Sequence, residues 1–198
     1  MILRYTNPNE WVLDQFVGSG TTLIEAKLLG RNAIGVDINP KSVAISKKNL
    51  DFQSDSNSKI HIINGNASNL NFIADNKIDL ICTHPPYANI IKYSDGIEGD
   101  ISQLNTEAFI EQMYKVASES YRVLKKGKIC AVMIGDIRKY GKVVPLGFRM
   151  MECFLQVGFL SKEIIIKEQH NCSSTPYWKK KDKHFLLLAH EYIFVFIK

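Results

Sequence analysis

The sequence is poor in cysteine and in long apolar runs. Its 198 residues include four cysteines, Cys82, Cys130, Cys153 and Cys172, with no CxxC pair and no histidine at metal-ligand spacing. This scatter argues against a zinc site and against a disulfide framework, so we expect reduced thiols and no metal. No apolar run approaches the roughly 20 residues that span a bilayer, and the amino terminus does not resemble a signal peptide. We therefore expect a cytoplasmic protein that does not enter a membrane.

The sequence also lacks internal repeats, low-complexity tracts and Pro/Gly-rich linkers. Its hydrophobic fraction of 45% and charged fraction of 23% are typical of a globular protein. Because 198 residues suffice for one continuous core, we expect a single domain over residues 1–198. The net charge of +5 and the pI near 8.9 favour a polyanionic partner but are shared by many proteins that have none.

Short apolar runs of two kinds alternate along the chain. Runs rich in β-branched and aromatic residues predict strands at residues 11–16, 33–37, 60–63, 78–83, 129–134, 164–166 and 192–197. Runs with apolar residues three and four positions apart predict helices at residues 21–29, 40–50, 106–124 and 145–157, two of them opening on proline. This alternation predicts a doubly wound α/β fold with a mostly parallel sheet. The loops after Phe16, Asp37, Ile63 and Thr83 should then share one ligand crevice.

A glycine turn between the first strand and the first long helix is the strongest local signal. Asp14 to Thr22 read DQFVGSGTT, and Gly35-Val-Asp37 ends the next strand. Gly18 and Gly20 allow the backbone to turn sharply and to approach a ligand, and Asp37 can accept hydrogen bonds from two ribose hydroxyls. Leu23 stands where a dinucleotide fingerprint has its third glycine, which disfavours NAD. The pattern therefore predicts a nucleoside-cofactor site, against the alternative of an ordinary turn.

Two consecutive prolines end the strand at residues 78–83. The segment reads His84-Pro85-Pro86-Tyr87, and two prolines cannot continue a central strand. They hold the residue before them and the aromatic ring after them rigidly where the sheet opens into the crevice. The alternative interpretation is a strand that simply ends at proline, with Tyr87 packed in the core.

FVGSGTT, HPPY and the closing HEYIFVF together resemble the adenine-N6 and cytosine-N4 DNA amino-methyltransferases over nearly the whole chain. The resemblance implies a Rossmann-like methyltransferase fold with an antiparallel carboxyl-terminal strand and S-adenosylmethionine as cofactor. It also implies a site-specific DNA methyltransferase of the kind found in restriction–modification. The expected cofactor residues, from the turn and from the resemblance, are Asp14, Phe16, Gly18, Gly20, Thr21, Thr22, Asp37, Ile38, Asn66, Ala67 and Thr83.

The family's catalytic tetrapeptide (D/N/S)PP(Y/F) corresponds here to His84, Pro85, Pro86 and Tyr87, so this sequence departs at the first position. An exocyclic amine is a poor nucleophile while its lone pair is delocalised, and hydrogen-bond acceptors can turn that lone pair toward the methyl group. The Pro85 carbonyl accepts such a bond, and His84 does so only if its facing nitrogen is unprotonated. Tyr87 is expected to stack on a base rotated out of the duplex. Alternatively, His84 only bridges neighbouring loops.

A second departure lies after the third strand, where the family commonly has an acid that binds the cofactor's adenine amino group. Asn66 takes that position, and its amide oxygen can still accept the hydrogen bond. A solvated turn is the alternative.

Basic and aromatic residues gather in three loops that follow predicted strands. They predict contacts to nucleic acid, against the alternative of solvated charged loops. The candidates are Lys92, Arg138, Lys139, Trp178, Lys179, Lys180 and Lys181.

Three functions remain open. The first is the DNA amino-methyltransferase, the second an enzyme that methylates base amino groups in RNA, and the third a non-catalytic cofactor-binding partner subunit. Little of the chain is left for a target-recognition domain, so recognition is expected from the loops, a second subunit or a homodimer. Because few residues precede the first strand, we also expect the methionine side of the cofactor pocket to be open, or completed by another chain. Weak cofactor affinity would follow.

Overall fold

The computed structural model describes residues 1–54, 56–88, 96–170 and 186–198. The helices are α1 (Ile2–Tyr5), α2 (Thr21–Leu28), α3 (Pro40–Asn49), α4 (Thr106–Val123) and α5 (Leu146–Val157), with a 3-10 turn η1 (Ile101–Gln103). The strands are β1 (Trp11–Asp14), β2 (Asn32–Asp37), β3 (Ile60–Asn64), β4 (Ile78–Thr83), β5 (Leu124–Ile134), β6 (Ile137–Lys139), β7 (Lys142–Val144), β8 (Leu160–Glu168) and β9 (His190–Ile197).

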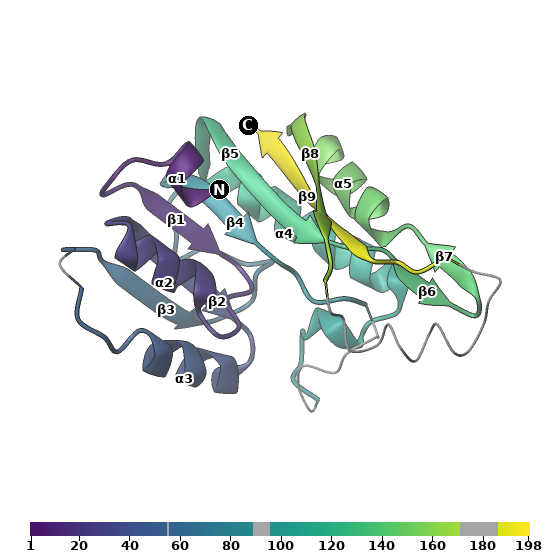
Figure 1. Cartoon of the computed structure of the whole chain (residues 1–198), viewed down its shortest axis with the longest axis horizontal. Helices are drawn as coiled ribbons and strands as arrows, with labels where there is room; N and C mark the ends of the chain where they lie inside the picture. The colour runs from purple at the N-terminus through teal and green to yellow at the C-terminus, as the bar shows by residue number, and fades with distance from the viewer. Residues whose placement is uncertain (55, 89–95, 171–185) are drawn as a thin grey trace.

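Seven of the described strands form one sheet in the order β3-β2-β1-β4-β5-β9-β8 (Figure 1). β1 to β5 run parallel, whereas β9 pairs antiparallel with β5 and with β8. Strand order reverses at β1, where β2 lies on one side and β4 on the other. The predicted α/β class, the mostly parallel sheet and the antiparallel carboxyl-terminal strand are confirmed.

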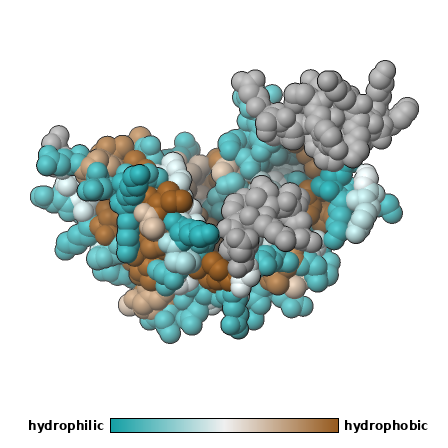
Figure 2. All heavy atoms as spheres, turned by 90° about the horizontal axis from the view of Figure 1, so that it is seen from below, coloured by the Kyte–Doolittle hydropathy of each residue, from teal (hydrophilic) through white to brown (hydrophobic). Residues whose placement is uncertain are grey.

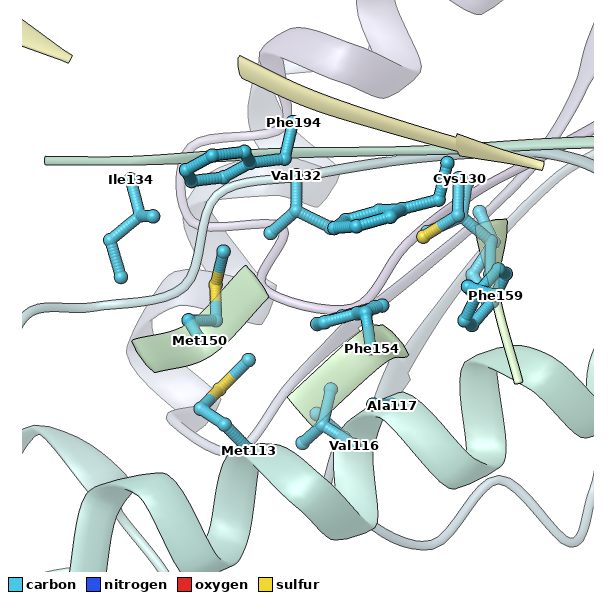
Figure 3. Packing of buried hydrophobic residues seen from close by; sticks show 14 of the residues in the cluster. Met113, Val116, Ala117, Cys130, Val132, Ile134, Met150, Phe154, Phe159 and Phe194 are labelled. Atoms are coloured by element: carbon cyan, nitrogen blue, oxygen red, sulfur yellow. The ribbon is translucent and has the colours of Figure 1, made fainter. Parts of the chain in front are cut away.

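The core consists of two layers, one on each face of the sheet. Consecutive strand residues alternate between the layers, so Val12 belongs to the cluster that includes residues of α2, while Leu13 belongs to the cluster that includes residues of α4 and α5. On the second face, Met113 and Val116 of α4 and Phe154 of α5 lie against β5 and β9 (Figure 3). Both faces of the central strands are therefore buried, which explains why their sequences are apolar throughout.

The structure differs from the sequence-based elements in a few places. Gly135 to Gly141, interpreted as a loop, contains β6 and leads into β7, and the two form a hairpin whose turn is Tyr140-Gly141. Each of these strands has only three residues, too short for an alternating pattern to be recognised. Pro40 is the first residue of α3 as expected, but Pro145 is the N-cap of α5 and not its first residue.

The described surface carries separate apolar patches surrounded by hydrophilic side chains (Figure 2). In the part of the chain that the structure describes, no helix is long and apolar enough to cross a membrane. Cys82, Cys130 and Cys153 are free thiols, and Cys172 lies outside the described residues. The described residues contain no group of three or more side chains suited to hold a metal ion.

Candidate functional site

A pocket of about 490 Å³ lies at the carboxyl ends of β1, β2 and β4. All four loops that were expected to share a crevice contribute to it: the glycine turn after β1, the turn after β2, the loop after β3 and the proline loop after β4. Of the residues named from the sequence, those that line it are Asp14, Phe16, Gly18, Thr21, Thr22, Asp37, Ile38, Asn66, Ala67, His84, Pro85 and Pro86. Gly20, Thr83 and Tyr87 are outside the lining.

The glycine turn has the backbone conformation that its sequence predicts. Gly18 and Gly20 have φ values of 52° and 92°, and Gly20 is the N-cap of α2. The Ser46 hydroxyl donates to the Gly18 carbonyl over 2.8 Å, and a Cβ on Gly20 would lie 3.2 Å from Ser46 Oγ. Gly20 thus shapes the turn from beneath and does not face the ligand. Ser46 was not identified from the sequence, because it is an ordinary helix residue 28 positions away.

Asp37 ties the turn to the end of β2. Its Oδ2 accepts a hydrogen bond from the Gly18 N–H over 3.0 Å, and its Oδ1 accepts one from the Asn39 N–H over 2.8 Å. Burial raises the pKa of Asp37, and the nearby Asp100 raises it further, although the two backbone donors act in the opposite direction. Asp37 still lines the pocket, so its oxygens are directed by the protein and accessible to a ligand.

Asp14 lies deeper, at the end of β1. Its Oδ1 accepts hydrogen bonds from the Phe16 N–H over 3.1 Å and from the Thr83 hydroxyl over 2.9 Å. Burial raises the pKa of Asp14, against the effect of hydrogen bonds from Thr22, Phe16 and Thr83. Thr83 therefore acts by linking β1 to β4 and is separated from the pocket itself.

Asn66 uses its amide oxygen within its own loop. Asn66 Oδ1 accepts from the Ser68 N–H over 2.9 Å and from the Ser68 hydroxyl over 2.8 Å. These bonds occupy both lone pairs of the oxygen that we expected to bind an adenine amino group. A buried acid that sequence reasoning missed, Asp100 at the N-cap of η1, lines the same pocket. It stands in a segment without clear periodicity, so no sequence signal identified it.

In the proline loop, His84 to Tyr87, one part lines the pocket and the other part contacts the sheet. His84, Pro85 and Pro86 line the pocket, whereas the Tyr87 hydroxyl donates to Glu191 Oε1 of β9 over 2.6 Å and accepts from the Gly135 N–H over 3.1 Å. The Tyr87 ring also packs against the main core cluster and lies edge-on to His84 at 5.9 Å. In this structure Tyr87 is therefore held both by packing and by its hydroxyl group.

His84 faces a buried carboxylate. Its Nε2 lies 3.6 Å from Glu191 Oε1, while Lys167 Nζ contacts Glu191 Oε2 over 2.7 Å. Burial lowers the pKa of His84 and outweighs the attraction of Glu191, so the imidazole is neutral at neutral pH. Glu191 is not among the site residues expected from the sequence. Its contact with the proline loop spans about a hundred residues and leaves no local signal.

Only two residues of the expected nucleic-acid contacts lie among the described residues. Arg138, on β6, donates to the carbonyls of Gly141 and Leu186, and Lys139 ends the same strand with its ammonium 5.6 Å from the Tyr140 ring centroid. Tyr140, at the hairpin turn, is 91% exposed. The other candidates, Lys92, Trp178, Lys179, Lys180 and Lys181, lie outside the described residues.

The fold is that of S-adenosylmethionine-dependent methyltransferases. A SAM-dependent methyltransferase from Methanosarcina mazei matches with a TM-score of 0.66 at 14% identity, covering 99% of this chain and 95% of that one. The family model for N6/N4 methyltransferases, described as DNA methylase, matches residues 1–48 and 78–198. The chain belongs to this DNA methylase family, as its motifs predicted.

Individual relatives point to both DNA and RNA enzymes. The Type II methyltransferase M2.DpnII of Streptococcus pneumoniae is 42% identical over 57 residues, 29% of this chain and 21% of the relative. The tRNA (guanine(10)-N2)-dimethyltransferase of Pyrococcus abyssi is 26% identical over 156 residues, 78% of this chain and 43% of the relative. The matched segments thus span less than half of these relatives' own lengths.

Proposed function

We propose that this chain transfers a methyl group from S-adenosylmethionine to the exocyclic amino group of adenine (N6) or cytosine (N4) in DNA. One observation carries the proposal: the glycine turn with Asp37 and the His84-Pro85-Pro86 segment line the same pocket. A nucleoside-binding element and a set of fixed hydrogen-bond acceptors are thereby adjacent, as methyl transfer to an amine requires.

The residues present suit the cofactor. The backbone of Gly18 approaches the pocket in a conformation that side chains rarely adopt, and Asp37 offers a carboxylate at the end of β2 for ribose hydroxyls. Phe16 and Ile38 supply apolar surface beside these polar groups. Because both Asn66 lone pairs are used by Ser68, we propose Asp100 as the acceptor for an amino group on the adenine side. When bound, S-adenosylmethionine supplies an electrophilic methyl group.

The protein's own contribution is to orient and activate the amine. The Pro85 carbonyl and a neutral His84 nitrogen accept hydrogen bonds from the amino group, which localises the nitrogen lone pair for attack. The nearest described thiol, Cys82, is unsuited to covalent catalysis because burial raises its pKa to about 11. We therefore propose direct attack by the amine: a new N–C bond would replace the S–C bond of the bound cofactor, and the amino group would release one proton to solvent.

RNA is the second candidate substrate. The tRNA (guanine(10)-N2)-dimethyltransferase of Pyrococcus abyssi matches 78% of this chain, whereas M2.DpnII matches 29%. DNA is favoured because the matching family model is that of DNA methylases and because the Type II relatives fit a restriction–modification setting. A non-catalytic subunit remains the third reading, prompted by His84 at the first position of the catalytic tetrapeptide.

Transfer of radiolabelled methyl groups separates these functions. The chain is incubated with labelled S-adenosylmethionine and, in parallel, with unmethylated genomic DNA or bulk tRNA, and the labelled base is identified after hydrolysis. Label on adenine-N6 or cytosine-N4 of DNA is the expected result. Label confined to guanine in RNA would replace the DNA proposal. No label on either, with the cofactor bound, would favour the non-catalytic subunit.

A further inference from the structure

Glu191 interacts with four side chains beneath the proline loop, those of Tyr87, His84, Lys167 and Gln169. It is the second residue of β9 and is 5% exposed. Its Oε1 accepts the Tyr87 hydroxyl at 2.6 Å and lies 3.6 Å from His84 Nε2, while its Oε2 accepts Lys167 Nζ at 2.7 Å. A buried carboxylate therefore faces one particular nitrogen of the imidazole that lines the pocket.

That geometry distinguishes the two tautomers of neutral His84. A carboxylate accepts hydrogen bonds and donates none, so it favours the tautomer that carries its proton on Nε2. The tautomer with a lone pair on Nε2 would point that lone pair at a negative charge inside the protein, where such repulsion is strong. The distance of 3.6 Å is longer than a direct hydrogen bond, as is common for catalytic contacts before the substrate binds.

We propose that Glu191 is a positioning residue that fixes His84 as the Nε2–H tautomer, leaving Nδ1 with a lone pair to accept a hydrogen bond from the target amino group. This inference rests on the proposed function. It explains how a histidine can stand where the family's tetrapeptide has Asp, Asn or Ser, since only this tautomer offers an acceptor at Nδ1 while Nε2 is directed at the carboxylate.

The surrounding charges keep His84 neutral. Lys167 of β8 pairs with Glu191 and lowers the pKa of His84, and burial lowers it more. Burial by itself raises the pKa of Glu191, but hydrogen bonds from Lys167 and Tyr87 more than offset this and keep the carboxylate charged. Three further acids, Asp14, Asp37 and Asp100, line the pocket with His84.

Nitrogen-15 NMR of the full chain tests the tautomer directly, with the His84 signals assigned by their loss in His84→Asn. We expect a single Nε2–H tautomer at neutral pH in the wild type and a mixture of tautomers in Glu191→Gln. Glu168→Gln, an exposed glutamate on the neighbouring strand, is the matched control and should leave the His84 signals unchanged. Tyr87→Phe removes the second contact to Glu191 Oε1 and should also preserve the tautomer.

Methyl transfer gives the second readout. Glu191→Gln should lower kcat by at least about tenfold with little change in the KM for S-adenosylmethionine. In the His84→Asn background, where there is no tautomer to select, the same substitution should change kcat by less than about twofold. An Nδ1–H tautomer in the wild type, or an equal loss of kcat in both backgrounds, would overturn the inference. Wild-type protein that methylates no nucleic acid would contradict the proposed function instead, while the NMR result would still decide the tautomer.

Discussion

At Asp37 one carboxylate both orders the backbone around it and lines the pocket. Its two oxygens accept the backbone N–H groups of Gly18 and Asn39, which fixes the glycine turn against the end of β2. Each carboxylate oxygen has a further acceptor position, so two ribose hydroxyls can still bind. A substitution at Asp37 should therefore affect binding both directly and through the shape of the turn.

We predict that Asp37→Ala weakens S-adenosylmethionine binding by about 10- to 100-fold, the range expected for lost hydrogen bonds to a charged group. Isothermal titration calorimetry of the cofactor measures it. Asp51→Ala, an exposed acid just after α3, serves as the matched control. Equal affinity of the Asp37 variant and the wild type would remove Asp37 from the site.

Gly35 is required for packing and not for backbone conformation. A Cβ at this position would lie 2.7 Å from side-chain atoms of both Leu23 and Val17, so α2 could not approach β2 as closely. We predict that Gly35→Ala lowers the free energy of unfolding by about 1–3 kcal/mol through overpacking. Gly65→Ala is the control, because its nearest contact would be an ordinary 3.5 Å. Urea unfolding measures the free energy of unfolding of both variants. A similar decrease in the two variants would contradict the packing argument.

What the sequence reveals at this scale depends on whether the contact is local. Gly18, Gly20 and Asp37 were predictable because a strand–turn–helix pattern fixes their places. Glu191 was not, because its partner Tyr87 is 104 residues away and only the folded sheet joins them. The hydrogen bonds from Ser68 to the Asn66 amide oxygen were not predictable either, because the sequence does not show which donor an amide oxygen binds.

The β6–β7 hairpin is the element that most clearly adds to the sequence analysis. It follows β5 directly after Gly135, whose N–H contacts Tyr87, so it leaves the sheet beside the proline loop. Tyr140 has a φ of 51° and Gly141 a φ of 76°, as a tight two-residue hairpin turn requires. The turn therefore presents an exposed ring between Lys139 and Lys142, on a hairpin whose preceding residue Gly135 contacts Tyr87.

We predict that the double substitution Lys139→Gln and Lys142→Gln weakens DNA binding and makes it less dependent on salt. Each phosphate contact that is lost should reduce the slope of log affinity against log salt by about 0.9. Lys47→Gln with Lys48→Gln, an equal change of charge at the exposed end of α3, is the control. Fluorescence anisotropy with a DNA duplex measures both slopes. If the slope of log affinity against log salt falls as much in the control variant, then DNA binding depends only on the net charge of the protein.

For the whole molecule, the order of elements was predictable because apolar strands and amphipathic helices alternate, and because both faces of β1, β2 and β4 are buried. The lengths of β5 and β8 were not predictable from the sequence. β5 includes Gly127, and three apolar residues of β8, Leu160, Ile164 and Ile166, are exposed, so neither strand matches a simple strand pattern. β8 pairs with β9 from Leu160 to Glu168, whereas the unpredicted start of β5 pairs with β4, with Leu124 opposite Ile78.

The sheet also separates two kinds of carboxylate. At the amino end of β4, Asp79 is paired with Lys125 at 2.7 Å and Lys128 at 3.5 Å and accepts from the Trp11 N–H. Burial acts to raise the pKa of Asp79, but these partners lower it overall. At the carboxyl ends, Asp37 has a raised pKa because the effect of burial outweighs that of its two backbone hydrogen bonds. Stability and ligand binding should thus respond to acid at different pH values.

We predict that acidification first reduces cofactor affinity and removes the stabilisation by Asp79 only at a lower pH. Asp37 has a folded-state pKa above its ordinary value of 3.8, so acidification protonates it early and removes acceptors from the pocket. The folded-state pKa of Asp79 lies below 3.8. Its contribution to the free energy of unfolding is therefore fully present above the unfolded-state pKa, and it disappears only as the pH falls through the lower folded-state pKa.

Asp79→Asn should lower the free energy of unfolding at neutral pH by about 1–3 kcal/mol and flatten its decline in acid, with cofactor affinity unchanged. Calorimetry of cofactor binding and urea unfolding, both over the same pH series, test this. If cofactor affinity persists down to the pH at which the Asp79 contribution to stability disappears, the prediction is wrong.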